Sequence, residues 1–153
     1  MRRKDKEITD RDVIDSIILN SRVCRLAMVD GDCPYVVPLS FGYSNNTLYF
    51  HSAPEGKKIR CIENNCNVCV EFDIDAKPIP ADTACKWSMR YRSAVAVGRA
   101  HLVHNPMEKH KALTVIAQHY GHQRDDVSPA AVKSLSIIKV TIDSVTGKIS
   151  GFS

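Results

Sequence analysis

The stretch YVVPLSFGYSNNTLYFH, residues 35–51, decides how this chain folds. Over its first half large apolar side chains alternate with smaller ones, which predicts a β-strand with the two kinds on opposite faces. The Asn45-Asn46 pair predicts a tight turn into a second strand over 48–51. Pro38 cannot donate a ladder hydrogen bond, so its strand is expected at an edge, at a bulge or where a ligand takes the neighbouring position.

Segments on both sides of this hairpin continue the antiparallel pattern. Upstream we expect a helix over 9–20, capped by Thr9, and a strand over 22–29. The elements expected downstream are a helix over 57–63, strands over 68–72 and 89–103 separated by a loop at 75–84, a helix from Asn105, and a last strand over 135–144. Hairpins dominate this order, so the expected fold class is mainly β (α+β), a six-stranded antiparallel barrel with flanking helices rather than a doubly wound sheet.

Length and composition describe an ordinary globular domain. The 153 residues are 44% hydrophobic and 25% charged, without repeats or a linker, so a single domain over 1–153 is expected. The N-terminus has no apolar stretch behind its charges, and no later run is long enough to span a bilayer, which predicts a cytoplasmic protein without a membrane partner. The net charge of +4 favours one anionic ligand over a polyanion such as nucleic acid.

The sharpest local feature is FHSAPEGKK, residues 50–58. It is expected to run from a strand end through a Gly-containing loop into a helix start, where backbone N–H groups and the ammonium groups of Lys57 and Lys58 suit a phosphate dianion. It is not a Walker loop, because His51 stands where the first Gly is needed and Lys58 where Ser or Thr is needed. Solvated lysines in a first helical turn explain the spacing equally well.

A second group of candidates stands at the entry of the long strand: Trp87, Tyr91, Arg92 and Ser93. Aromatic and basic groups together suit an aromatic ring with polar edges, although a dimer or core contact also explains the Trp. Among the histidines, His51 differs from the scattered others because it ends a strand beside the expected phosphate loop and can hydrogen-bond a ligand.

The cysteines offer an alternative that we do not favour. Cys61, Cys66 and Cys69 have the spacing of part of a plant-type iron–sulfur motif, with Cys85 as a possible fourth ligand. However, Cys61 falls on an expected helix and Cys69 on an expected strand, whereas such a cluster needs a loop wrapped around the metal. No Cys or His pair stands at zinc spacing, so no metal site is expected and the thiols are expected to be free.

Three groups of motifs in this order resemble a known family. They are VVPLSFGY (36–43), then LYFHSA (48–53) with GKK (56–58), then CKWS (85–88) with YRS (91–93) and GRA (98–100). Over about residues 1–150 the chain is similar to the FMN-binding split-barrel proteins related to pyridoxamine 5′-phosphate oxidase, and among these to the Nim-type nitroimidazole-resistance flavoproteins.

The resemblance implies a six-stranded split barrel, a homodimer, and FMN in two clefts between the subunits. By position it assigns Val37, Pro38, Leu39 and Ser40 to the flavin ring and ribityl chain, Phe50 and His51 beside that chain, Lys57 and Lys58 to the phosphate, Arg92 and Ser93 near the flavin, and Trp87 and Ser88 to the border of the cleft, from this chain or its partner. The chain stops soon after its last expected strand, without the C-terminal segment that completes the substrate pocket of true pyridoxamine-phosphate oxidases, so that activity is not expected.

Two function hypotheses follow from the sequence and the resemblance. The first is an FMN-dependent oxidoreductase that reduces a small flat acceptor such as a nitroaromatic, with His51 as a proton donor. The second is a non-catalytic module that stores or senses flavin, or holds haem. Nucleic-acid binding is a weaker third, because no strand interleaves several aromatic and basic residues.

Overall fold

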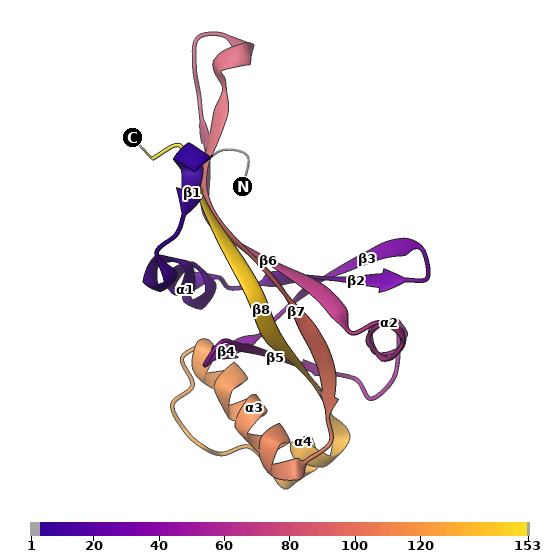
Figure 1. The fold of residues 1–153 in the computed structure, drawn as a ribbon. Helices are drawn as coiled ribbons and strands as arrows, with labels where there is room; N and C mark the ends of the chain where they lie inside the picture. The colour runs from indigo at the N-terminus through magenta and orange to yellow at the C-terminus, as the bar shows by residue number, and fades with distance from the viewer. Residues whose placement is uncertain (1–3, 153) are drawn as a thin grey trace.

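One antiparallel sheet organises the computed structural model, which describes residues 4–152 (Figure 1). Its strand order is β3-β2-β6-β7-β8-β5-β4, and the short β1 pairs with β8. The strands are β1 (Glu7–Ile8), β2 (Cys24–Asp30), β3 (Cys33–Leu39), β4 (Gly42–Ser44), β5 (Thr47–Ser52), β6 (Asn67–Ile79), β7 (Ser88–Val103) and β8 (Ser136–Ser150). The helices are α1 (Arg11–Asn20), α2 (Lys57–Asn64), α3 (Pro106–His119) and α4 (Pro129–Ser134), with 3-10 turns at Lys4–Lys6 and Ala84–Lys86. The antiparallel class is confirmed, with eight strands in the described residues instead of the six expected.

The barrel is closed by a strand that changes partners. β3 and β4 lie at opposite edges of the sheet, yet only Ser40 and Phe41 separate them in the chain. The Phe41 N–H leaves the ladder and donates to the Tyr120 hydroxyl at 3.1 Å. A Cβ on Gly42 would lie 2.7 Å from the backbone N of Ile116, so only glycine lets α3 approach this closely. The alternation over residues 35–43, which predicted one strand, is therefore divided between two strands, and Pro38 lies on the edge strand β3, one of the three places expected for it.

Two apolar clusters lie on the two sides of β5. The larger fills the barrel, where the rings of Phe41 and Phe72 meet edge to face with their centroids 5.1 Å apart. The smaller packs under α3 and comprises Tyr49, Val103, Ala112, Ile116 and Ile137. Alternation along β5 sends its successive side chains into one cluster and then the other.

Several element ends differ from the prediction. Asp10 caps α1 in place of Thr9, by accepting the Asp12 N–H at 2.9 Å. β8 continues to Ser150 because its extension pairs with β7. The six-residue α4 was not predicted, since a helix this short offers too few turns for an apolar stripe.

β6 and β7 extend beyond the barrel as a projecting arm, residues 75–90, at the top of Figure 1. The loop expected over 75–84 is wrong in its first part, because the ladder resumes after a register shift between Ile74 and Lys77. Pro78 is tolerated there since a two-stranded ribbon leaves one side of each strand without a partner.

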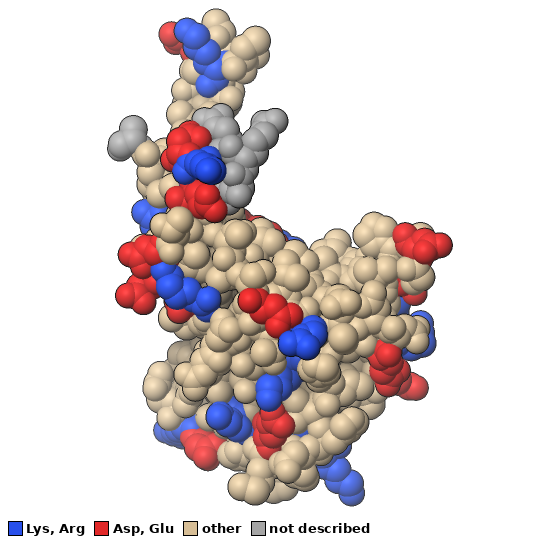
Figure 2. Space-filling view, viewed as in Figure 1, with Lys and Arg blue, Asp and Glu red and all other residues tan. Residues whose placement is uncertain are grey.

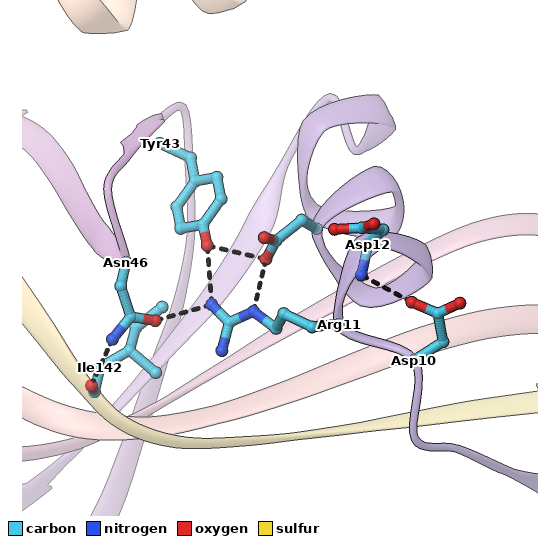
Figure 3. A network of polar contacts seen from close by, with 7 residues as sticks. Asp10, Arg11, Asp12, Tyr43, Asn46 and Ile142 are labelled. Carbon is cyan, nitrogen blue, oxygen red and sulfur yellow. Dashed lines mark hydrogen bonds and ion pairs between the residues drawn. The ribbon is translucent and has the colours of Figure 1, made fainter.

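A polar network fastens α1 to the β4–β5 hairpin and to β8 (Figure 3). Asn45 and Asn46 have φ angles of 50° and 59°, which confirms the expected tight turn. Arg11 donates from Nη2 to the Tyr43 hydroxyl at 2.8 Å and to Asn46 Oδ1 at 2.7 Å, while Asn46 Nδ2 donates to the Ile142 carbonyl at 2.9 Å. These bonds fix the hairpin that precedes the candidate site.

Acidic and basic side chains alternate over the face drawn in Figure 2, with no continuous basic stripe on that face. Within residues 4–152, no helix has the length and apolar character needed to cross a membrane.

Candidate functional site

The loop before α2 ends in a glycine that the backbone requires. Gly56 has φ 133° and ψ 177°, a conformation that residues with a side chain rarely adopt. No side chain caps the first turn of α2, and nothing lies within 4 Å of the position that a Gly56 Cβ would occupy. The N–H groups of this turn therefore have no side-chain acceptor among the described residues.

The two lysines that follow are in different situations. The Lys57 ammonium lies 2.8 Å from Asp30 Oδ2 and 4.6 Å above the centre of the Tyr35 ring, and its hydrogen bond to Asp30 raises its pKa. Lys58 is half-buried and has no hydrogen-bond or ion-pair partner in the described chain, and burial lowers its pKa. The Lys58 ammonium is a positive group that lacks a counter-ion.

β3 forms a wall beside this helix start. Val37 and Leu39 point inward and pack against the main core, whereas Pro38 and Ser40 are exposed on the other side. Gly42 and Tyr49 form the last pair at one end of the β4–β5 ladder. Ser40 precedes Gly42 by two residues and His51 follows Tyr49 by two, so both lie at this end of the ladder. The ladder thus places Ser40 and His51 at one end, and the Lys57 contact with Tyr35 joins the start of α2 to the beginning of β3.

Phe50 and His51 face opposite ways. Phe50 is fully buried in the main core, so its side chain is not available to a ligand. His51 is exposed and pairs with Ile137 of β8, on the side of the sheet that α3 covers. Only His51 of this pair offers a polar side chain to the surroundings.

The remaining predicted residues lie on or near the arm. Trp87 is 57% exposed and donates its indole N–H to the Ala81 carbonyl at 2.8 Å, and Ser88 is also exposed. Arg92 and Ser93 lie at the base of the arm, paired with Ile74 and Asp73 of β6. In Figure 1 the arm and α2 lie far apart, so one chain does not bring Trp87 and Lys58 together.

A polar groove of about 690 Å³ lies between the end of α1, β2 and the base of the arm. Its lining includes Arg92, which the sequence predicted, and Arg22, Arg25, Asp73 and Asp75, which it did not. Arg25 pairs with Asp73 and, at 3.4 Å, with Glu71, while Arg92 lies 3.3 Å from Asp75. The sequence signal for this groove was the presence of charged side chains on the outward positions of two strands. Only the strand order shows that these strands are neighbours and that the charges pair.

The cysteines do not gather around a metal. Cys61 lies buried on α2 and Cys69 alternates within β6, as the sequence predicted. No cluster of three or more His, Cys, Asp or Glu side chains suited to a metal ion occurs among residues 4–152. Burial raises the pKa of Cys24 to about 12, so this thiol stays protonated.

An apolar row crosses part of the outer side of the sheet, beside the outward charges of Arg25, Glu71 and Asp73. Val36, Ala27, Cys69 and Val97 pair directly across β3, β2, β6 and β7, so they lie in one row on one side. Val36 is 59% exposed and Val97 48% exposed. We call this row, with Val29 and Val95, the outer face.

Known proteins resemble this chain over most of its length. Residues 10–149 match the family model described as pyridoxamine 5′-phosphate oxidase. The solved structure of a proposed 5-nitroimidazole antibiotic resistance protein from Bacteroides thetaiotaomicron is 40% identical, with a TM-score of 0.84 over 94% of this chain and 86% of that one.

Two further relatives are more distant. The FAD and haem binding protein from Mycobacterium smegmatis has a TM-score of 0.85 at 19% identity, over 96% of this chain and 74% of that one, which shows a shared fold. An uncharacterized protein of Rhizobium meliloti (strain 1021) is 31% identical over 65 residues, which is 42% of this chain and only 42% of that relative. The family match and the 40% identical structure together show that this chain belongs to the pyridoxamine 5′-phosphate oxidase family, with its split-barrel fold.

Proposed function

We propose that this protein binds FMN and acts as an oxidoreductase toward a small flat acceptor such as a nitroaromatic. The observation that carries the proposal is Lys58, a half-buried ammonium without a counter-ion beside the uncapped start of α2. A partly buried charge without a partner is unfavourable. A bound phosphate dianion would supply the counter-ion that the Lys58 ammonium lacks.

Lys58 and the first-turn N–H groups of α2 are the proposed phosphate ligands. The open space at Gly56 lets a phosphate approach the backbone closely. Lys57 is already held by Asp30, so we assign it a supporting role: it adds positive potential and fixes α2 against the β2–β3 hairpin. The exposed edge of β3 at Pro38 and Ser40 is the proposed wall for the ribityl chain and the ring, with Val37 and Leu39 contributing through their backbone.

The distribution of the site residues supports a homodimer. Trp87, Ser88, Arg92 and Ser93 belong to the arm and its base, away from α2 of the same chain (Figure 1). In the proposed dimer they approach the flavin held by the other subunit. The apolar outer face supports the same arrangement, because an exposed valine row of this kind is typical of an interaction surface.

His51 is the proposed proton donor. When bound, the flavin supplies the electron transfer, and the protein provides binding, orientation and protons. His51 is exposed at the same end of the barrel as Ser40, where an acceptor stacked on the ring can be reached. The 5-nitroimidazole resistance described for the Bacteroides relative is the basis for a nitroaromatic acceptor.

A second candidate function is a non-catalytic flavin or haem carrier on the same barrel. The relative from Mycobacterium smegmatis is described as binding FAD and haem, and it shares the fold at low identity. A bound flavin that reduction bleaches, and that no acceptor reoxidises, would favour this candidate.

The first experiment is the visible spectrum of the purified protein, with the cofactor released by denaturation and identified. We expect a flavin spectrum and FMN. Lys58→Ala should lower FMN affinity tenfold or more, since a hydrogen bond to a charged group contributes about 1.5–3 kcal/mol. Lys111→Ala is the matched control, because Lys111 is exposed on α3, away from α2. Unchanged FMN affinity in Lys58→Ala would remove the phosphate assignment.

A His51→Ala variant tests the catalytic part separately. It should keep its FMN and lose turnover of a nitroaromatic acceptor. Undiminished turnover would exclude His51 as the proton donor without affecting the cofactor assignment.

A further inference from the structure

A second cavity, of about 710 Å³, lies between α3, the linker that follows it, and α4. It is separate from the α2 lysines and from the outer face. Its lining residues are His104, Pro106, Met107, Lys109, His110, Val127, Pro129, Val132 and Lys133. The volume is in the range of small-molecule sites.

The lining combines apolar walls with positive charge. Met107, Val127 and Val132 provide apolar surface from three different segments. The ammonium groups of Lys109 and Lys133 form no ion pair within the described chain, and no carboxylate lines the cavity. A ligand that suits both features has an apolar body and a negative end.

The wall formed by the linker is held in place by hydrogen bonds. Thr114 Oγ1 donates to Asp125 Oδ1 at 3.1 Å, and His110 Nε2 lies 3.4 Å from the same carboxylate. His122 and Asp126 are in contact at 2.7 Å within the linker, and Ser128 caps α4 by accepting the Ala131 N–H at 3.2 Å. The cavity is therefore formed before any ligand binds, which lowers the entropic cost of binding.

We propose that this cavity binds a small amphipathic carboxylate, with its tail or ring against Met107, Val127 and Val132 and its carboxylate near Lys109 and Lys133. It lies near the end of the sheet that carries His51: His51 pairs with Ile137, Ile137 with Val103, and the cavity residue His104 follows Val103. A carboxylate here occupies a site distinct from the proposed FMN cradle. The inference does not depend on flavin binding.

Sodium decanoate is a suitable probe, titrated below its micelle concentration into the protein as purified while the methyl resonances of Met107, Val127 and Val132 are followed. We expect these methyls to shift together and saturate. The double variant Lys109→Glu/Lys133→Glu should weaken decanoate binding about tenfold or more, because two attractive charge contacts become repulsive. The control Lys77→Glu/Lys86→Glu has the same change in net charge on the arm, away from the cavity, and should bind normally.

Three results would overturn the inference. The first is a set of shifts centred on the outer-face valines instead of the cavity. The second is equal affinity for decanoate and the neutral decanol, which would show that the carboxylate contributes nothing and that binding is only apolar. The third is an equal loss of binding in the control, which would show only a long-range charge effect. The same titration on protein stripped of any flavin gives the same outcome if the site is independent, whatever the FMN experiment shows.

Discussion

The inner and outer faces of β7 are built from residues of different size. On β7 the buried inner positions are small (Ala94, Ala96, Gly98 and Ala100), while the outer positions next to them are the larger Val95 and Val97. The inner side chains pack within the barrel, where there is space only for small residues. The valines of the outer face are exposed, and no helix or strand among residues 4–152 covers them, so this row is suited to a partner from outside the chain.

The same contrast separates the two lysines of α2. Lys57 has found Asp30 and Tyr35, whereas Lys58 has no anionic partner in the described chain. Side chains that have partners within the chain stabilise the fold. Side chains without such partners mark where a ligand or a second subunit is expected to bind. The contrast is testable because a residue of each kind stands next to the other, as at Val97 and Gly98 of β7 and at Lys57 and Lys58 of α2.

The largest effect is expected inside the barrel, at Gly98. A Cβ there would lie 2.2 Å from the Thr141 carbonyl oxygen, at the point where the β7–β8 register shifts. Gly98→Ala should therefore lower the free energy of unfolding by about 3 kcal/mol, measured by urea denaturation. Ala substituted at the adjacent Val97 is the control and should cost much less. Equal stability of the two variants would show that the inner face is not tightly constrained.

The next effect is expected on the outer face. Val97→Asp places a carboxylate in the centre of the valine row and should dissociate the proposed dimer, with a loss of about 2 kcal/mol or more in association. Sedimentation velocity measures the change, and circular dichroism should show a folded chain. Gln118→Asp on α3 is the control. A variant that remains dimeric would place the subunit contact elsewhere.

A smaller effect concerns the pH dependence of FMN binding. Burial lowers the pKa of Lys58, so its ammonium is lost at a lower pH than that of an ordinary lysine. Only the ammonium form attracts phosphate, so FMN affinity should fall as pH rises through that lowered pKa, by at most about tenfold per pH unit. Lys58→Ala should lack this alkaline decline. Lys57→Ala should retain it, because Asp30 raises the pKa of Lys57 and keeps it charged.

The smallest effect is a difference in thiol reactivity. Cys33 and Cys85 are exposed and should react readily with a thiol reagent at pH 8, whereas the buried Cys24, with its pKa raised to about 12, should react only on unfolding. Cys69 lies beside Val97 on the outer face. It should be protected in the proposed dimer and become reactive in Val97→Asp, which links this measurement to the subunit contact.

Local pattern was enough to predict the hairpin around Asn45-Asn46, because the turn depends on neighbouring residues. It limited Pro38 to an edge, a bulge or a ligand position, and the strand order decides for the edge. The break at Ser40 could not be predicted, since the acceptor for the Phe41 N–H is Tyr120, far along the chain. The arm was missed for a similar reason: its Pro and Ala residues are typical of a loop, and only pairing with β7 makes a strand of Lys77–Ile79.

Prediction of the candidate site divides in the same way. Residue type and spacing identified Lys57 and Lys58, but not which of them is free, because that depends on Asp30 at the end of β2. The cavity at α3 and α4 had no local signal, since its residues come from segments that pack together only in the fold. Tertiary packing, which no short pattern encodes, decides both points.

β8 has a consequence for how the chain is made. It pairs with β1, β5 and β7, and joins residues as distant as Glu7 and Lys148. All three partners are synthesised before it. While the ribosome still holds β8, the β4–β5 hairpin and β7 lack a strand between them, and closing such long-range contacts is slow. The nascent barrel therefore stays open until β8 emerges, and its apolar interior is exposed to association with other chains during that interval.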